Sequence, residues 1–316
     1  MPEWRNSSGM IRHSKHHHID IAFVYGLAVI SVLALSNVER MVTRVQETIL
    51  PTHTQHVETS PLFKSEAFSG VVVKGKAYVV YDIVDEKVIA GKNQEVVLPL
   101  ASITKVMMAV TARTHYGKKQ HVTINPASVD DGYDLGLKKG QVFDLDELLK
   151  YTLVFSSNDG AQAIADGLGG RSSFVNQMNE DAKSLGLLLH FTHPAGLDEG
   201  NKIGGEGSAL SVAKLVAIAK KDFPELFDAT TKRRVSVKAS TGSIIGIPNT
   251  NQEVINLTGI EASKTGYTDK AGGNLVVIVD IAVGHPVAIV ILGSTHEERF
   301  SDVEILYKAL QKSLEK

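Results

Sequence analysis

The chain has 316 residues, which is enough for one large domain or two and for a sizeable buried core. Its formal net charge is −2, and this balance does not favour a nucleic-acid partner. The sequence contains no cysteine, which excludes disulfides, thiol nucleophiles and cysteine-ligated zinc. Such a composition fits an oxidising compartment without requiring one.

An apolar segment near the N-terminus predicts that the rest of the chain is exported. Residues 21–35, IAFVYGLAVISVLAL, carry no charge, and with the two residues before them they approach the length that spans a bilayer. Basic residues precede the segment and favour an orientation with the N-terminus inside the cell: Arg5, Arg12 and Lys15. Ala34 and Ser36 have roughly the spacing of a signal-peptidase site, so cleavage and secretion are the alternative to an uncleaved anchor.

This pattern divides the chain into four segments. We expect a cytoplasmic tail at residues 1–18, a membrane anchor or signal segment at 19–36, a polar linker at 37–65 and an exported domain at 66–316. The protein would then be a single-pass membrane protein with its domain outside the cytoplasm, or a secreted protein if the segment is cleaved.

The exported domain begins with strand patterns and continues with helical ones. Strands are expected around Ala77–Asp82 and Lys87–Ala90, and a helix from Ser102 to Tyr116. Asp144 and Glu147 have the spacing of a capping box at the start of a leucine-rich helix. Helical segments with glycine-rich breaks follow to about Lys221.

The end of the chain returns to strands. Three strand-like segments, GIEASKTGYT, NLVVIVDIAV and HPVAIVILGS, precede a final helix from about Glu297, and the last two strands form a predicted hairpin across Gly284–His285. Strands at both ends predict an α+β fold in which one antiparallel sheet is formed from both ends of the domain and flanked by helices. The inserted helical region spans about residues 101–230.

Lys105 is the only charged residue in the apolar run from Val96 to Ala112. On a helix, Ser102 lies one turn away on the same face, and none of the three- and four-residue neighbours of Lys105 is a carboxylate. Burial without a partner lowers the pKa of an ammonium, and a neutral amine beside a serine hydroxyl activates a nucleophile. The alternative is that Lys105 extends to the surface and Ser102 only caps the helix.

Two further motifs follow Ser-x-x-Lys. Ser156, Ser157 and Asn158 lie where one predicted helix ends and the next begins, a place where caps are common. Lys264, Thr265 and Gly266 lie on a strand, where a lysine ordinarily protects an edge from aggregation. In this order and on these elements, the three motifs form the active-serine penicillin-recognising signature.

With these motifs the chain resembles the serine D-alanyl-D-alanine carboxypeptidases, the low-molecular-mass penicillin-binding proteins. The resemblance covers about Ala77 to Ser294 and includes the segment FVNQMNEDAKSLGLLLHFTHPAGLDEG between the second and third motifs. Ser157 departs from the glycine that is frequent at its position. Many members carry a second, all-β domain after the catalytic domain, and we expect none here.

The resemblance implies an enzyme of cell-wall biogenesis that needs no metal or other cofactor. It would remove the terminal D-alanine from peptidoglycan stem peptides through an acyl-enzyme, and β-lactams would inhibit it by acylating the same serine. Ser102 would be the nucleophile, Lys105 its base and Ser156 the proton relay to the leaving D-alanine. Substrate would be held by Asn158, by Lys264 and Thr265 at the carboxylate, by Gly266 through close backbone approach, and by the N–H groups of Ser102 and Tyr267 at the oxyanion.

Several alternatives share parts of this pattern. A class A-like β-lactamase would need a deacylating glutamate in a Glu-x-x-Leu-Asn pattern, and no glutamate between Asn158 and Lys264 has asparagine four residues later. A D,D-endopeptidase, which cuts crosslinks, and an esterase are not separated by the sequence. An inactive cell-wall-binding module is the non-enzymatic alternative, and the complete set of chemical residues counts against it.

Overall fold

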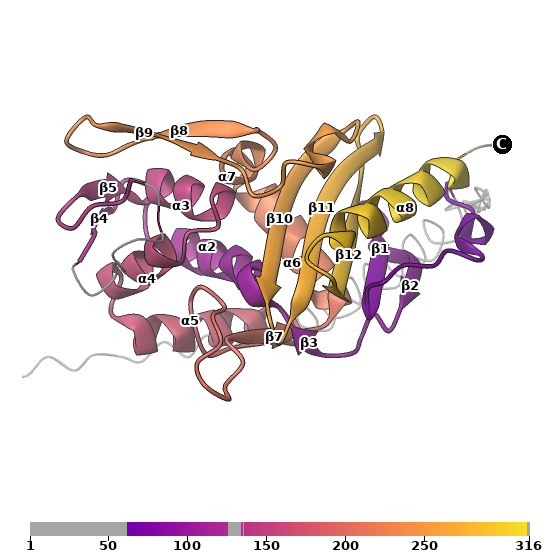
Figure 1. Ribbon diagram of the computed structural model, residues 1–316, viewed down its shortest axis with the longest axis horizontal. Helices are drawn as coiled ribbons and strands as arrows, with labels where there is room; N and C mark the ends of the chain where they lie inside the picture. The colour runs from indigo at the N-terminus through magenta and orange to yellow at the C-terminus, as the bar shows by residue number, and fades with distance from the viewer. Residues whose placement is uncertain (1–61, 126–133, 135, 315–316) are drawn as a thin grey trace, which may run out of the picture. The chain divides into compact units, whose positions relative to one another are not determined.

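A five-stranded antiparallel sheet forms the centre of the structure, and its strands come from both ends of the described chain (Figure 1). The computed structural model describes residues 62–125, 134 and 136–314, which belong to the unit Ser60–Lys316. The strand order is β10-β11-β12-β1-β2. The strands are β1 (Ala77–Asp82), β2 (Lys87–Lys92), β10 (Ile260–Thr268), β11 (Gly272–Ala282) and β12 (His285–Ser294). The predicted α+β fold and the predicted hairpin between the last two strands are confirmed.

The central strands are apolar at almost every position because both faces of the sheet are covered. Alternate residues of a strand point to opposite faces, and on β11 Val276 packs into one cluster of buried side chains while Val277 packs into another. Helix α8 (Glu298–Ser313) and the short η1 (Ser65–Phe68) cover the face of the sheet to which Val277 points. The helical region covers the other face, so no strand at the centre needs a polar side.

The inserted region between the two halves of the sheet is mainly helical, as expected. Its elements are η2 (Ala101–Ile103), α2 (Thr104–His115), α3 (Leu145–Val154), α4 (Asn158–Gly167), α5 (Arg171–Ser184), α6 (Ala209–Asp222) and α7 (Pro224–Ala229). Short strands that the sequence did not predict join them: β3 (Leu98–Pro99), β4 (His121–Thr123), β5 (Val142–Asp144), β6 (Leu189–Phe191) and β7 (Gly205–Gly207). Two or three residues cannot display a strand period, so only tertiary pairing defines these elements.

A hairpin of β8 (Arg234–Lys238) and β9 (Ile244–Pro248) follows α7, and η4 (Val254–Asn256) leads into β10. The hairpin lies beyond α3 and α7 at the edge of the helical region (Figure 1). The chain between this hairpin and β10 therefore passes close to the end of α3, where Thr250 N–H donates to Val154 O at 3.1 Å.

The predicted capping box at Asp144 and Glu147 is wrong. Asp144 does occupy the N-cap position of α3, but its side chain makes no capping hydrogen bond. Its carboxylate lies 3.0 Å from Nδ1 of His121, its partner across the β4–β5 pair. Glu147 accepts from Lys150 Nζ at 2.9 Å and from the Lys238 N–H at 2.8 Å. Tertiary partners thus occupy both carboxylates that the local pattern assigned to the helix end.

The N-terminal apolar segment and most of the expected linker lie outside the described residues. Within the described ranges, no helix is both long and apolar enough to cross a membrane. The folded unit begins slightly before the expected boundary at residue 66, because Phe63 is buried and Lys64 N–H donates to Ser313 O at 3.1 Å.

Candidate active site

Ser102 lies in the single 3-10 turn that connects β3 to α2. The sequence predicted a helix from Ser102, whereas the α-helix begins two residues later at Thr104. Ala101, just before the serine, has φ of +49°, a left-handed conformation that is uncommon for a residue with a side chain. The turn therefore places Ser102 just before the N-terminus of α2, and the serine side chain lines a pocket.

Lys105 is fully buried in the first turn of α2, with 0% of its surface exposed. Its Nζ makes three hydrogen bonds, to Ser102 Oγ and Asn158 Oδ1 at 2.8 Å each and to Ala195 O at 2.9 Å. Burial lowers the pKa of Lys105 to about 7, although the negative charge of Asp134 opposes this shift. The side chain does not extend to the surface, and its amine has the basicity that a general base needs near neutral pH.

Ser156, Ser157 and Asn158 connect α3 to α4, as the sequence predicted. Ser157 caps α4 by accepting from the Gly160 N–H at 2.7 Å, and its hydroxyl also donates to a carboxylate oxygen of Asp134. Ser156 has φ of +62°, and such a strained conformation is typical of functional positions. The strain turns Ser156 toward the sheet, where its Oγ accepts from Lys264 Nζ at 2.8 Å.

Lys264 is buried on the edge strand β10, with only 2% of its surface exposed. This burial excludes the alternative in which Lys264 is exposed and protects the edge of the sheet from aggregation. Besides Ser156, its Nζ donates to Thr265 O at 2.8 Å. Burial lowers the pKa of Lys264 well below its usual value, and the positive charges of Lys105 and Arg299 act in the same direction. The structure thus places Lys264 behind Ser156, where it does not line the pocket that was expected to receive a carboxylate.

Gly266 allows β10 to lie directly against the turn that carries Ser102. A Cβ atom at this position would lie 2.9 Å from Leu100 O and 3.2 Å from Ser102 N. Close approach of substrate backbone was the reason expected for this glycine, and contact with the nucleophile turn is a second reason. The same contact brings the peptide that joins Gly266 to Tyr267 close to the backbone of Ser102, which suits the expected pair of oxyanion donors.

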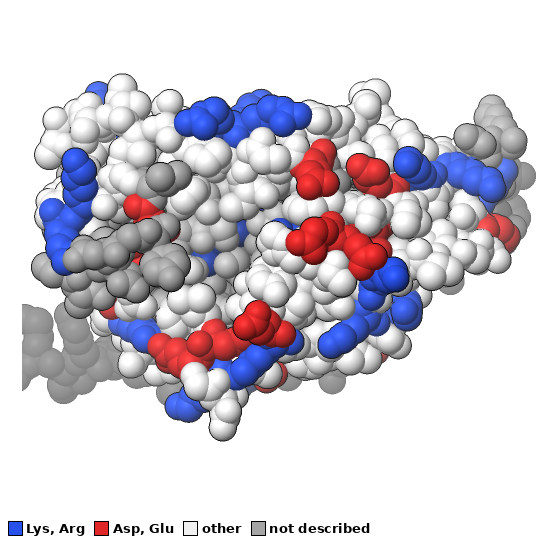
Figure 2. Space-filling model, in the orientation of Figure 1, with Lys and Arg blue, Asp and Glu red and all other residues white. Residues whose placement is uncertain are grey.

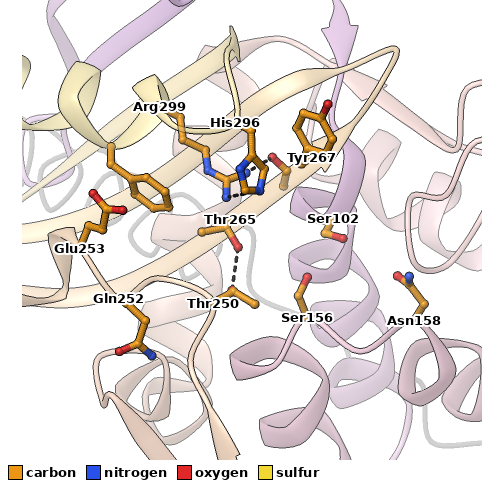
Figure 3. A pocket seen from close by; sticks show the side chains of 12 residues that line it. Ser102, Ser156, Asn158, Thr250, Gln252, Glu253, Thr265, Tyr267, His296 and Arg299 are labelled. Atoms are coloured by element: carbon orange, nitrogen blue, oxygen red, sulfur yellow. Dashed lines mark hydrogen bonds between the residues drawn. The ribbon is translucent and has the colours of Figure 1, made fainter. Parts of the chain in front are cut away.

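A pocket of about 490 Å³ joins the predicted residues (Figure 3). Six of them line it: Ser102, Ser156, Asn158, Thr265, Gly266 and Tyr267. The serines and Asn158 lie on the helical side, and Thr265 lies in the middle, where its Oγ1 is 2.7 Å from Thr250 Oγ1. In Figure 2 blue atoms of lysine or arginine are visible at the floor of the hollow between the helical region and the sheet, and acidic side chains lie along its sheet side.

Several residues of the pocket were not predicted from the sequence. The most important is Arg299 in the first turn of α8, which is 95% buried, since its exposed fraction is 5%. Its Nη1 donates to Gly266 O at 2.9 Å, and its guanidinium lies over the ring of Phe300. Burial lowers the pKa of Arg299, but a guanidinium stays charged at any ordinary pH. Thr250, Gln252, Glu253 and His296 complete the lining. No local pattern marks these residues, because they reach the site only through tertiary packing.

A serine paired with a buried amine of pKa about 7, with a second serine–lysine pair across the pocket, defines a serine hydrolase that works through an acyl-enzyme. The chain belongs to the D-alanyl-D-alanine carboxypeptidase family, whose sequence profile matches residues 64–296. The members of this family that resemble the chain are low-molecular-mass penicillin-binding proteins, as the sequence predicted.

Individual relatives support this assignment. The chain is 31% identical over 201 residues to the D-alanyl-D-alanine carboxypeptidase DacB2 of Mycobacterium tuberculosis, covering 62% of this chain and 67% of the relative. It is 29% identical over 228 residues to a D-alanyl-D-alanine endopeptidase of Escherichia coli, covering 70% and 71%. The crystal structure of a D-alanyl-D-alanine carboxypeptidase from Mycobacterium tuberculosis H37Rv superposes with a TM-score of 0.69 at 26% identity, covering 76% of this chain and 91% of that one.

Proposed function

We propose that the protein is a serine D,D-carboxypeptidase that removes the terminal D-alanine from peptidoglycan stem peptides. The observation that carries this proposal is the 2.8 Å contact between Lys105 Nζ and Ser102 Oγ, together with a pKa of about 7 for the lysine. A base of this pKa is partly unprotonated at neutral pH and can still release its proton later in the cycle. Family membership and the serine hydrolase site support the same activity.

Acylation begins with attack of Ser102 Oγ on the carbonyl carbon between the two D-alanines, and Lys105 Nζ takes the hydroxyl proton. The N–H groups of Ser102 and Tyr267 stabilise the oxyanion that forms. Ser156 then donates its hydroxyl proton to the departing nitrogen and is reprotonated by the proton that Lys105 took from Ser102, so Lys105 is neutral again. Lys264, which shares a 2.8 Å hydrogen bond with Ser156, orients the relay serine and keeps its own protons. The C–N bond breaks, free D-alanine leaves, and an ester links the peptide to Ser102.

Deacylation repeats the same chemistry with water as the nucleophile. Departure of D-alanine leaves space on the Thr265 side of the ester, where water can enter. Lys105 accepts a proton from this water and returns it to Ser102 Oγ as the ester bond breaks. The cycle therefore consumes one water and restores the resting protonation of both lysines.

The carboxylate of the terminal D-alanine fits the part of the pocket around Thr265. Thr265 and Thr250 offer hydroxyl groups, and Arg299 supplies a charge that does not titrate. Lys264 lies behind the pocket, where it donates to Ser156 and to the Thr265 carbonyl and does not line the carboxylate site. A cation and hydroxyl donors are suitable partners for a carboxylate.

D,D-endopeptidase activity is the second candidate, and the length of the pocket favours it. Beyond Thr265 the lining continues to Gln252 and Glu253, which lie on the far side of the pocket from Ser102 (Figure 3). This part of the pocket could receive a leaving group larger than D-alanine, such as that of a crosslinked peptide. Relatives named D-alanyl-D-alanine endopeptidase at 29% identity support this candidate.

Rapid hydrolysis of penicillin is not expected. A β-lactamase needs a base that activates water on the penicilloyl ester, and among the described residues that line the pocket Glu253 is the only carboxylate. It lies on the side remote from Ser102 (Figure 3). β-Lactams are therefore expected to acylate Ser102 and to stay bound, which is the inhibition implied by penicillin-binding relatives. A purely wall-binding role is disfavoured by the two complete serine–lysine contacts.

We further infer that the protein acts outside the cytoplasm at the cell membrane. Support comes from the uncharged run at residues 21–35 and from the basic residues that precede it. Protease added to intact spheroplasts should digest the catalytic domain. Complete protection until the cells are lysed would reverse this topology.

The experiment that tests the activity compares two substrates. A peptide ending in D-Ala-D-Ala should release one free D-alanine per molecule, and a crosslinked dimer should be cleaved if the extended part of the pocket admits it. Release of D-alanine without dimer cleavage identifies a carboxypeptidase, and cleavage of the dimer alone identifies an endopeptidase. Hydrolysis of neither substrate by protein that binds penicillin would contradict both assignments.

A further inference from the structure

The hydrogen bonds of Lys105 restrict how this amine can act as a base. A neutral amine has two N–H donors and one lone pair. Asn158 Oδ1 and Ala195 O are acceptors only, and they lie 2.8 and 2.9 Å from Nζ. When they take the two N–H groups, the lone pair faces the third neighbour, Ser102 Oγ at 2.8 Å. The position of the Ala195 carbonyl therefore decides where the lone pair points.

Ala195 belongs to a buried turn, and a histidine side chain holds that turn. Gly196 N–H donates to His193 O at 3.1 Å, which closes the turn, and the Ala195 N–H donates to Nδ1 of the His193 ring at 3.0 Å. Ala195 is fully buried, so its N–H would have no water to replace this partner. On its other side the turn is packed against the nucleophile turn, because a Cβ on Gly196 would lie 2.0 Å from Ala101 O.

The ring of His193 has the protonation that this role requires. A backbone N–H can only donate, so Nδ1 is unprotonated and the proton of the neutral ring is on Nε2. Nε2 points toward Glu199, whose carboxylate lies 4.0 Å away and is bound by Arg171 at 2.6 Å. Burial lowers the pKa of His193 to about 4; the charges of Arg171 and Lys105 act in the same direction, and that of Glu199 opposes them.

We propose that His193 is a positioning residue for the general base: its Nδ1 fixes the Ala195 peptide, whose carbonyl aims the Lys105 lone pair at Ser102. This inference rests on the proposed function, since it concerns the same acylation step. His193 touches neither substrate nor the reacting atoms. Its loss should slow acylation without weakening the initial binding of substrate or penicillin, because Thr265 and Arg299 lie elsewhere in the pocket.

The test replaces the ring with a side chain that has or lacks an acceptor. His193→Leu removes the acceptor, and the acylation rate constant for penicillin should fall by about 10- to 100-fold with an unchanged dissociation constant for the initial complex. His193→Asn keeps an oxygen that can accept from the N–H two residues later, and it should restore acylation to within a few-fold of wild type. His190, exposed on the neighbouring strand β6, supplies the matched controls His190→Leu and His190→Asn, which should leave the rate unchanged.

A measurement on the unaltered chain covers the case in which His193→Leu does not fold. In the NMR spectrum of protein labelled with ¹⁵N-histidine, the signal of His193 is identified as the one that is absent from the spectrum of His193→Asn. This signal should show that Nδ1 is unprotonated from pH 5 to 8. Equal acylation by wild type and a folded His193→Leu would overturn the proposal, as would slow acylation by a folded His193→Asn or a protonated Nδ1. If wild type itself neither binds penicillin nor releases D-alanine, the proposed function fails instead.

Discussion

Two serine–lysine pairs face the same pocket with the same separation, yet they are built by different regions of the molecule. Ser102 and Lys105 are one turn apart on η2 and α2, with Oγ and Nζ at 2.8 Å. Ser156 and Lys264 are 108 positions apart and come from the α3–α4 junction and from β10, also at 2.8 Å. The first pair is fixed by the geometry of one helix, and the second exists only when the sheet and the helical region are assembled.

The charges around the two lysines differ in sign. The carboxylate of Asp134 raises the pKa of Lys105 against the effect of burial, so this amine titrates near neutral pH. The neighbours of Lys264 are the cations Lys105 and Arg299, which lower its pKa together with burial. Equal distances therefore do not imply equal roles. The local pair, Ser102 and Lys105, is suited to proton exchange between a base and a nucleophile. The second pair, Ser156 and Lys264, is suited to proton relay to a leaving group.

The largest expected effect separates the two serines. Ser102→Ala removes the nucleophile, so covalent labelling by a fluorescent penicillin should disappear and release of D-alanine should fall by roughly 10³-fold or more. Ser156→Ala removes only the relay, so labelling on Ser102 should persist at a lower rate. A labelled Ser102→Ala protein would show that the roles of the two pairs have been assigned in the wrong order.

The next effect separates the two lysines. Lys105→Arg should lower acylation by roughly 10²- to 10⁴-fold, because a guanidinium cannot give up its proton to act as a base. Lys264→Arg keeps a donor for Ser156 and should lose less, about 10-fold, because only the geometry of this hydrogen bond changes. Stopped-flow acylation by a chromogenic cephalosporin measures both. Near-normal acylation by the Lys105→Arg variant would rule out Lys105 as the base.

A smaller effect concerns the pH dependence. Acylation requires neutral Lys105, so its rate should rise with pH through about 7, the pKa of this amine. Asp134→Asn removes the negative charge that raises this pKa, and the midpoint of the acidic limb should move to lower pH. Asp144→Asn, which alters a carboxylate beside exposed His121, serves as the control. A midpoint that stays in place or moves upward in Asp134→Asn would contradict this account of the local pair.

The smallest effect tests the contact between the sheet and the nucleophile turn. Gly266→Ala introduces a Cβ 2.9 Å from Leu100 O, and we expect it to lower the free energy of unfolding by about 1–3 kcal/mol and to slow acylation. Gly117→Ala places its Cβ in open space and should change the free energy of unfolding by less than about 0.5 kcal/mol. Thermal unfolding and penicillin labelling report the two quantities. An unchanged acylation rate in Gly266→Ala would show that the strand does not position Ser102.

The local pair could be predicted from the sequence because its information is local. An isolated lysine in an apolar run, three residues after a serine, already implies burial and contact on one helix face. The strands of the sheet were also predictable, because long apolar runs such as NLVVIVDIA reveal a strand buried on both faces. The second pair could be assigned only through the order of the motifs and the family resemblance, since spacing says nothing about contacts across 108 positions.

The residues that support the two pairs left no signal that could be recognised. Arg299 is one of several charged residues at the start of a helix that looks solvent-exposed in the sequence, and only packing against β10 buries it. His193 accepts from a backbone N–H only two residues away, but its importance depends on the Ala195 carbonyl, which contacts Lys105 from 90 positions along the chain. Asp134 acts through the hydroxyl of Ser157, 23 positions away. The capping box at Asp144 failed for the related reason that a cross-strand histidine competes for the carboxylate.

The central claim is that Ser102, activated by Lys105, forms a covalent acyl-enzyme. The most direct test is intact-protein mass spectrometry after treatment with penicillin, followed by peptide mapping. The mass should increase by one drug molecule, the adduct should map to Ser102, and it should persist for minutes or longer while the untreated enzyme releases D-alanine from a D-Ala-D-Ala peptide. An adduct on Ser156, or rapid repeated hydrolysis of penicillin with no D-alanine released from the peptide, would contradict the account.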